Sequence, residues 1–290
     1  LPPGTSTEIL FLDVQGRIEH AAHLLEDGAA AWLVTDREDG PGLAAWLTSM
    51  RFSHDVTLRD HTGAVAVVGA TAPVPGWEDR TVWLDPWPRV GAGGWAYTAD
   101  PDPATRTGVL AGWSLAGTTA AEALRIEAGR PRRALDVDDR AIPHELDLLR
   151  TAVHLEKGCY RGQETVARVH NLGRPPRRLT RLLLDGSVHA LPEHGAPVIL
   201  RPAEDTPEAR AAARPVGTVT AAAQHHEAGA VALALLKRTV PVDAELLVRE
   251  DAPGEDGAAE GGWIAASQEP LVSPDAGQVV GRPRGVGRLR

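Results

Sequence analysis

Residues 157–168 read KGCYRGQETVAR, and Cys159 in this stretch is the only cysteine among 290 residues. Gly158 and Gly162 stand on either side of it. Because glycine lacks a Cβ, it adopts backbone angles closed to other residues and lets another segment approach closely. The stretch follows one predicted helix, and we expect a second helix to begin near Gln163. The sequence therefore predicts that Cys159 lies in a loop beside a helix N-terminus.

The residues alone leave two interpretations of Cys159 open. Lys157 and Arg161 lie two positions to either side, where an extended chain would place them on the same face as the thiol. Neighbouring cations lower the pKa of a thiol, so this arrangement is typical of a reactive thiolate beside an anion pocket. The alternative is a small buried apolar side chain with both cations in solvent.

The surroundings of Cys159 are basic within an acidic chain. The net charge is −9, yet residues 157–181 hold one carboxylate, Glu164, against seven cations. These cations are Lys157, Arg161, Arg168, Arg174, Arg177, Arg178 and Arg181. A site for an anionic ligand is one interpretation and a solvated basic face is the other. The overall negative charge argues against nonspecific nucleic-acid binding by the whole molecule.

Length and composition indicate a globular protein of two or three domains, and the single cysteine is consistent with the reducing cytoplasm. No run of 18 apolar residues occurs, so we expect neither a transmembrane helix nor a membrane partner. A single cysteine excludes an intramolecular disulfide and a self-contained thiolate metal site. The start, LPPGTSTEIL, has no signal-peptide pattern and no initiator Met, so we expect an N-terminal segment to be missing.

The first part of the chain alternates short apolar runs with turns. Strands are expected over 7–13, 17–25, 29–35, 56–60, 64–69 and 81–87. Helices are expected over 41–51, over 120–128 with Thr118 or Thr119 as the cap, and over 144–156. Strands followed by a helix and further strands indicate an α+β fold.

The composition changes at residues 171–179, where Gly173 and the pair Pro175-Pro176 interrupt any helix and suggest an interdomain hinge. Beyond it, strands are expected over 179–186, 196–200, 215–224, 229–240 and 244–250. Five short strands in this span predict a small β-barrel or sandwich. The expected domains are residues 1–172, an α+β portion of two lobes; 173–250, the barrel; and 251–290, an acidic linker with an Arg/Gly-rich tail.

Three weaker motifs do not support a function. GAGGWA (91–96) fits a dinucleotide fingerprint but follows a Pro-rich loop. GWSLAG (112–117) has its second glycine one position late for a nucleophile elbow. His20 and His23 fall in a predicted strand, where they face opposite sides, so no metal site is predicted.

The stretch KGCYRGQETVAR resembles the signature of the YgfZ family, K-G-C-[FY]-x-G-Q-E-x-x-x-[RK]. EALRIEAGRP (122–131), IPHELDLL (142–149), GRPPRRL (173–179) and ALALLKR (232–238) also look like segments of that family. YgfZ proteins are tetrahydrofolate-binding paralogues of the glycine-cleavage T-protein, an aminomethyltransferase, and are linked to the maintenance of iron–sulfur proteins. The resemblance implies three lobes around a central folate channel and a small C-terminal β-barrel, with residues 1–172 as the folate-binding portion.

The resemblance also implies a set of site residues. Cys159 and Lys157 are the implied reactive pair, and the signature supplies Tyr160, Gln163, Glu164 and Arg168 as cofactor-binding residues. Arg161, at an undefined position of the signature, is expected to join them as a neighbouring cation. Glu127 matches the T-protein glutamate that binds the pterin, whose paired N–H donors suit a bidentate acceptor. The alternative for Glu127 is an exposed helix charge. The basic stretch through Arg178 would meet the glutamate tail of the folate.

One segment departs from the T-protein pattern. T-proteins carry an acidic pair in a sequence like G-G-I-x-D-D, whereas this chain reads GRIEHA over 16–21. His20 and Ala21 take the places of the pair, and Glu19 is offset to the other strand face. Neither His20 nor Ala21 can act as the required carboxylate, so glycine cleavage is not expected.

Three functions follow as hypotheses. The first is a tetrahydrofolate-binding protein that supports iron–sulfur cluster assembly or repair, with iron–sulfur client or assembly proteins as partners. The second is a folate-dependent methyl- or aminomethyltransferase acting on a protein or RNA; the sequence itself offers no support for tRNA as a partner. The third is a noncatalytic scaffold that binds anions through residues 157–181. Whether the protein is catalytic stays open.

Overall fold

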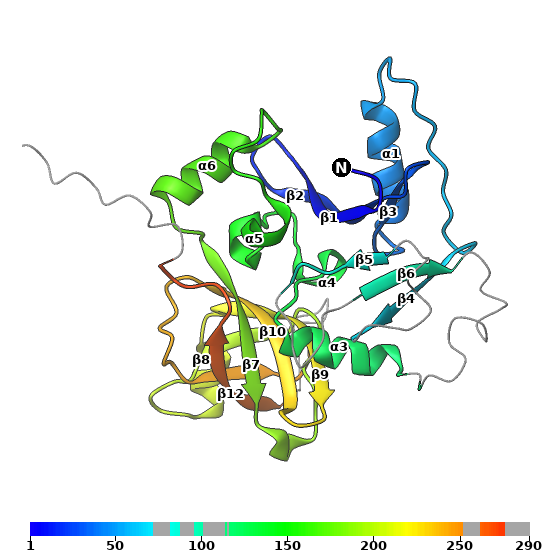
Figure 1. The fold of residues 1–290 in the computed structure, drawn as a ribbon. Coiled ribbons are helices and arrows are strands. Elements are labelled where there is room, and N and C mark those ends of the chain that lie inside the picture. The colour runs from blue at the N-terminus through cyan, green and yellow to red at the C-terminus, as the bar shows by residue number, and fades with distance from the viewer. Residues whose placement is uncertain (72–81, 88–95, 101–113, 115, 252–261, 276–290) are drawn as a thin grey trace, which may run out of the picture.

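Three β-sheets surround a group of short helices (Figure 1). This computed structural model describes residues 1–71, 82–87, 96–100, 114, 116–251 and 262–275. The first sheet, in the order β1-β2-β3, is antiparallel and contains β1 (Thr5–Leu12), β2 (Ile18–Glu26) and β3 (Ala31–Val34). The second, in the order β4-β6-β5, contains β4 (Ala66–Ala70), β5 (Val82–Leu84) and β6 (Ala96–Asp100).

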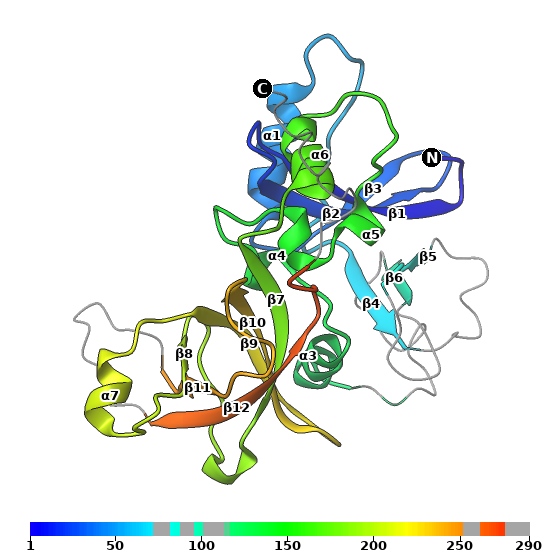
Figure 2. The ribbon, with the colours of Figure 1, turned by 90° about the vertical axis from the view of Figure 1, so that its left-hand side faces the viewer.

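The third sheet is a closed barrel in the order β10-β7-β12-β11-β8-β9. Its strands are β7 (Arg177–Leu184), β8 (Pro197–Leu200), β9 (Gly217–His225), β10 (Gly229–Lys237), β11 (Leu246–Arg249) and β12 (Trp263–Pro270). Seen from the side, the barrel lies below the first sheet, with α3 between it and β4 (Figure 2). The α+β fold with a C-terminal barrel is confirmed.

Eight helical segments connect and cover these sheets in the described residues. They are α1 (Gly40–Met50), α3 (Thr118–Glu127), α4 (Arg133–Asp136), η2 (Pro143–Leu146), α5 (Leu149–Ala152), α6 (Gln163–Leu172), η3 (Gly186–Val188) and α7 (Pro207–Ala212), with η denoting 3₁₀ turns. None of the described helices is long and apolar enough to cross a membrane.

Strand β10 is apolar along almost its whole length because it borders two cores. Ala232, Ala234 and Leu236 point into the barrel, while Leu233 and Leu235 belong to the core that also holds Ile126 of α3. Successive side chains of a strand point to opposite faces, so an uninterrupted apolar run is required when both faces are buried. This double burial fixes α3 against the outside of the barrel.

Several sequence-based expectations were wrong. The helix over 144–156 is replaced by η2 and α5, because Asp147 adopts a left-handed conformation, φ +59°, that Asp tolerates and a helix does not. Residues 56–60 form no strand, and Gly117 rather than a threonine occupies the N-cap of α3.

The barrel also extends further than predicted. Strand β12 pairs with β7 and β11, so the barrel continues beyond residue 250 into the segment expected to be a linker and tail. The sequence of β12, WIAASQEP, is apolar in its first half and polar in its second, so it lacks the alternation that signals a strand. Some predictions concern residues that the structure does not describe. These are the segments 252–261 and 276–290, residues 91–95 of the motif at 91–96, and half of the motif at 112–117.

A buried ion pair joins the start of the barrel to the first part of the chain. The fully buried carboxylate of Glu145 accepts hydrogen bonds from Arg177 Nε at 3.0 Å and Nη2 at 2.8 Å. Arg177 also binds Asp138 and thereby lowers the pKa of that carboxyl. Residues 174–177 are therefore tied down rather than a free hinge.

We predict that Glu145→Gln lowers the free energy of unfolding by about 2 kcal/mol, because it removes the buried carboxylate that holds Arg177 through charged hydrogen bonds and leaves that cation with Asp138 alone. Glu245→Gln is the matched control, since Glu245 pairs with Arg201 at a side-chain exposure of 74% and such pairs contribute less than about 1 kcal/mol. Urea denaturation measures both variants. Equal losses would show that Glu145 does not join the two parts.

Candidate ligand site

The signature segment is docked onto the turn between β1 and β2. Gly162 has φ +81° and serves as the N-cap of α6. A Cβ on Gly162 would come within 2.7 Å of both the Asp13 carbonyl oxygen and the Gly16 Cα. Gly162 is thus required by its backbone angle and by close backbone contact, as the sequence suggested for a glycine beside Cys159.

Cys159 is exposed, in the loop that the sequence predicted. The Lys157 ammonium lies 5.0 Å from the centre of the Tyr160 ring, a cation–π contact, and burial raises the pKa of the Tyr160 phenol. Arg161 is 3.2 Å from the Glu19 carboxylate. Both cations near the thiol therefore have other partners, and their predicted support of a thiolate stays a prediction.

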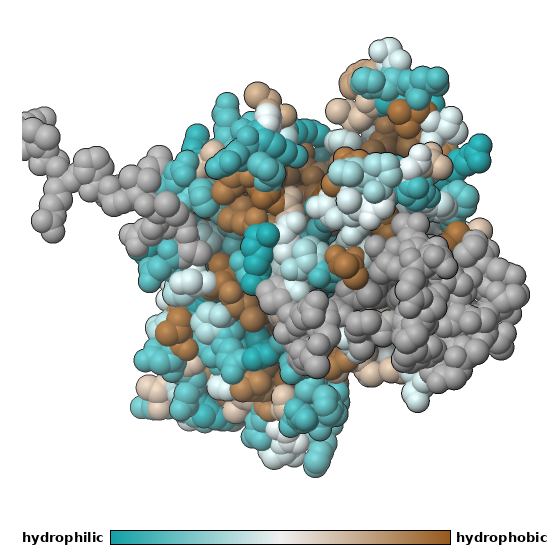
Figure 3. Space-filling model, viewed as in Figure 1, coloured by the Kyte–Doolittle hydropathy of each residue, from teal (hydrophilic) through white to brown (hydrophobic). Residues whose placement is uncertain are grey.

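The rest of the signature lies on α6. Glu164 and Arg168 are exposed and Gln163 is half-buried in the first turn. Apolar residues also reach the surface around α5 and α6 (Figure 3). Beneath α6, burial lowers the pKa of His144 in η2 to about 4, so this imidazole is neutral at pH 7.

The basic stretch is largely neutralised in space. Of its seven cations, four arginines pair with carboxylates from distant segments: Arg161 with Glu19, Arg174 with Asp275, Arg177 with Glu145 and Asp138, and Arg181 with Glu269. Of these seven cations, all of which the structure describes, only Lys157 and Arg168 are both exposed and outside an ion pair. A continuous anion-binding face over 157–181 is therefore wrong.

Arg178 has no access to a ligand. It is fully buried, and its guanidinium donates to the carbonyl oxygens of Arg238 at 3.0 Å and Val240 at 2.9 Å and to the Gln268 side chain at 2.9 Å. Burial lowers the pKa of this guanidinium. The predicted contact between Arg178 and a folate tail is wrong, because the side chain holds together the loop after β10 and strand β12.

Glu127 ends α3 and faces the barrel. Its Oε2 lies 3.1 Å from Nε2 of His225 at the end of β9, and its side chain keeps 26% of its surface exposed. Arg181 of β7 donates to the main-chain oxygen of Glu127. The carboxylate is thus neither buried nor a free helix charge.

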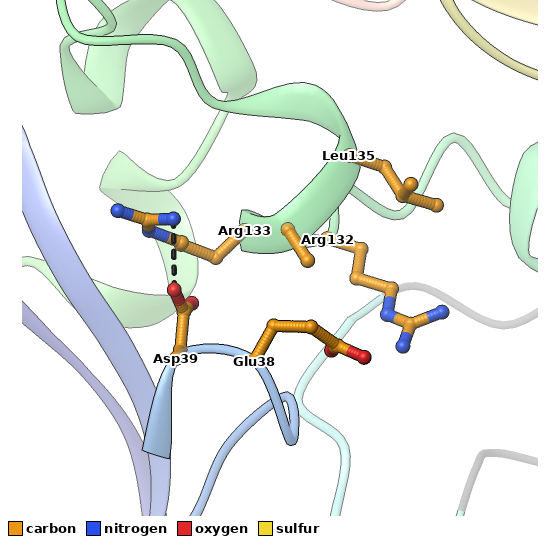
Figure 4. Close-up of a pocket in the computed structure, with 6 residues that line it drawn as sticks. Glu38, Asp39, Arg132, Arg133 and Leu135 are labelled. Carbon is orange, nitrogen blue, oxygen red and sulfur yellow. Dashed lines mark ion pairs between the residues drawn. The ribbon is translucent and has the colours of Figure 1, made fainter. Parts of the chain in front are cut away.

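Arg133 borders two open cavities. One, of about 320 Å³, is bordered by Glu38, Asp39, Arg132 and Arg133 (Figure 4). The other, of about 270 Å³, is bordered by Asp13, Arg17, Ile18, Glu19, His20, Trp46, Arg133 and Asp139. Glu19 and His20 border the same cavity, although strand alternation predicted opposite faces, because they lie at the start of β2 beside the turn.

Arg133 forms an ion pair beside the two cavities. Its Nη1 binds Asp39 at 2.8 Å. Burial raises the pKa of Asp39, and burial followed by the charge of Arg133 lowers the pKa of His20. Sequence reasoning missed Asp39, Arg133 and His225, and only Asp39 had a signal, as a cap residue before a helix. Neither Glu127 nor Cys159 borders either cavity. Among the described residues, no group of three or more His, Cys, Asp or Glu side chains could hold a metal ion.

The fold is that of the T-type aminomethyltransferases. The glycine cleavage system aminomethyltransferase T from Bartonella henselae superposes with a TM-score of 0.67 over 96% of this chain and 78% of the other, at 18% identity. At that identity, the likeness concerns the fold alone.

The sequence is similar to YgfZ. The tRNA-modifying protein YgfZ of Shigella dysenteriae serotype 1 is 35% identical over 131 residues, which is 45% of this chain and 37% of the relative. YgfZ of Escherichia coli strain SMS-3-5 is 34% identical over the same length. The match therefore spans little more than a third of these relatives. No family model matches the chain. The resemblance to YgfZ inferred from the signature is confirmed.

We predict that Gly162→Ala destabilises the protein by about 2 kcal/mol or more, because both its positive φ and its contact with the Asp13–Gly16 turn exclude a Cβ. Gly158→Ala is the control, because nothing lies within 4 Å of a Cβ at that position. Thermal unfolding and the rate of tryptic cleavage after Lys157 and Arg161 measure the effect. Equal stability of the two variants would show that the loop is not docked on the turn.

Proposed function

We propose that this protein binds a tetrahydrofolate, with the pterin ring at Glu127, and supports iron–sulfur cluster assembly or repair. The observation that carries the proposal is the carboxylate of Glu127, anchored by His225 yet partly open to solvent. Because this carboxylate is partly shielded from water and already hydrogen-bonded to His225, it can accept N–H donors from a ligand without first losing a full hydration shell. The similarity to YgfZ and the aminomethyltransferase fold support it.

The signature residues take defined parts in this proposal. The polar groups that the signature offers to the ligand are those of Tyr160, Gln163 and Glu164. Arg161 holds Glu19 in place. The cation that meets the folate tail is Arg168 rather than Arg178. Cys159 is the reactive or partner-contacting thiol, with Lys157 beside it. Its exposure supports contact with a protein client. The single cysteine of the chain supports a cytoplasmic location.

Modification of tRNA is a second candidate, favoured by the relatives, which are named tRNA-modifying proteins. A folate-dependent transfer of a one-carbon group to RNA would join this candidate to the first. The net charge of −9 and the paired arginines weigh against a broad RNA-binding face, so a tRNA would be held through a small number of contacts. Comparing tRNA nucleosides from cells with and without the protein distinguishes the two candidates.

Glu127→Gln is expected to weaken tetrahydrofolate binding about tenfold or more, because a hydrogen bond to a charged group contributes about 1.5–3 kcal/mol. Anaerobic titration calorimetry with a reductant gives the dissociation constants. Glu208→Gln, an exposed change on α7, is the control and should bind like wild type. If wild type fails to bind tetrahydrofolate at millimolar concentration, the folate proposal fails.

Cys159→Ala is expected to leave the protein folded, since the side chain is exposed, and to abolish its support of iron–sulfur enzymes. The measurement is the activity of such an enzyme in a bacterial strain that lacks its own YgfZ protein and expresses either form at equal level. Ser273→Ala serves as a folded control outside the signature. Full restoration by Cys159→Ala would remove the thiol from the function.

A further inference from the structure

The imidazole of His225 is held in one orientation and one tautomer. His225 closes β9 opposite Gly229, the first residue of β10, and is 2% exposed. Its Nδ1 accepts the backbone N–H groups of Glu227 at 3.2 Å and Ala228 at 3.0 Å. An atom that accepts two hydrogen bonds carries no proton, so a neutral ring has its proton on Nε2. The turn between β9 and β10 therefore makes Nε2 a donor.

That donor is directed at Glu127. Nε2 lies 3.1 Å from Oε2 of Glu127, although the two residues are 98 positions apart. The side chain of His225 is 1% exposed and that of Glu127 is 26% exposed, so the hydrogen bond is shielded at the histidine end. The main-chain oxygen of Glu127 is held separately by Arg181, which also pairs with Glu269 of β12. Two barrel strands thus hold Glu127 by both its side chain and its backbone.

We propose that His225 is the positioning residue of the ligand site. It holds Oε2 of Glu127 and leaves Oε1 as the oxygen that receives the ligand. A free glutamate at a helix end samples many rotamers and must lose that freedom on binding, whereas this one has already lost it on folding. This inference rests on the proposed function. The Glu127 carboxylate then accepts from the ligand through Oε1 alone, instead of through both oxygens, and it selects a ligand N–H at a single fixed angle.

A competing role for His225 is purely structural, as the acceptor that builds the β9–β10 turn. The two ring nitrogens can be tested separately. Asn places an oxygen near the position of Nδ1 and forms the same type of turn, but it cannot reach Glu127. Gln places an amide N–H near the position of Nε2, but it does not provide the turn acceptor.

If His225 positions Glu127, His225→Asn weakens tetrahydrofolate binding about tenfold with little loss of thermal stability. His225→Gln then binds within about threefold of wild type in spite of a lower melting temperature. The opposite pattern, with binding kept in His225→Asn and lost in His225→Gln, overturns the inference. His189→Asn is the control, because that imidazole is exposed at the end of η3, where Asn tolerates the left-handed backbone, and it should change neither quantity.

A second measurement does not need the ligand. Long-range proton–nitrogen correlation spectra of wild type should show His225, assigned by its absence in His225→Asn, with the proton on Nε2. Glu127→Ala should shift the Nε2 resonance, because its hydrogen-bond acceptor is removed. If wild type binds no tetrahydrofolate, the proposed function fails, but this spectrum still tests the inference. An Nε2 resonance that is unchanged in Glu127→Ala would show that His225 does not hold the carboxylate.

Discussion

The double burial of β10 is the constraint on which the arrangement of the molecule depends. One face of the strand fills the barrel and the other packs with α3, so neither can shift without exposing apolar surface to water. Because α3 is fixed in this way, its last residue, Glu127, meets the end of β9. The candidate ligand site is therefore a product of the contact between helix and barrel, and it would not exist in either part alone.

The arginines show how local charge in a sequence differs from charge in space. Residues 157–181 are basic in sequence, yet most of their guanidinium groups form ion pairs with carboxylates of other segments. Arg178 lies where no solvent reaches it and satisfies carbonyl groups. The region thus uses its cations to join segments of the chain to one another, which leaves Lys157 and Arg168 as candidates for contact with a ligand.

Much of the fold could be predicted because its strands are short, apolar and separated by clear turns. The signature loop could be placed because its two glycines indicate backbone angles and close contacts that other residues do not allow. The helix over 144–156 failed at Asp147, where the apolar spacing is correct but the backbone turns left-handed. Strand β12 was missed since its polar residues give no alternation. The pairing of Glu127 with His225 could not be predicted, because a contact between residues 98 positions apart depends on closure of the barrel. No periodic pattern in the sequence signals such a contact.

The contact between Gly162 and the Asp13–Gly16 turn also sets how far the thiol can act. Cys159 lies three residues from this fixed point, and a chain of three residues spans at most about 10 Å. On its other side, Gly158 has open space around it. The backbone of Cys159 therefore lies within that distance of the β1–β2 turn, so any group that reacts with the exposed thiol must reach this part of the surface.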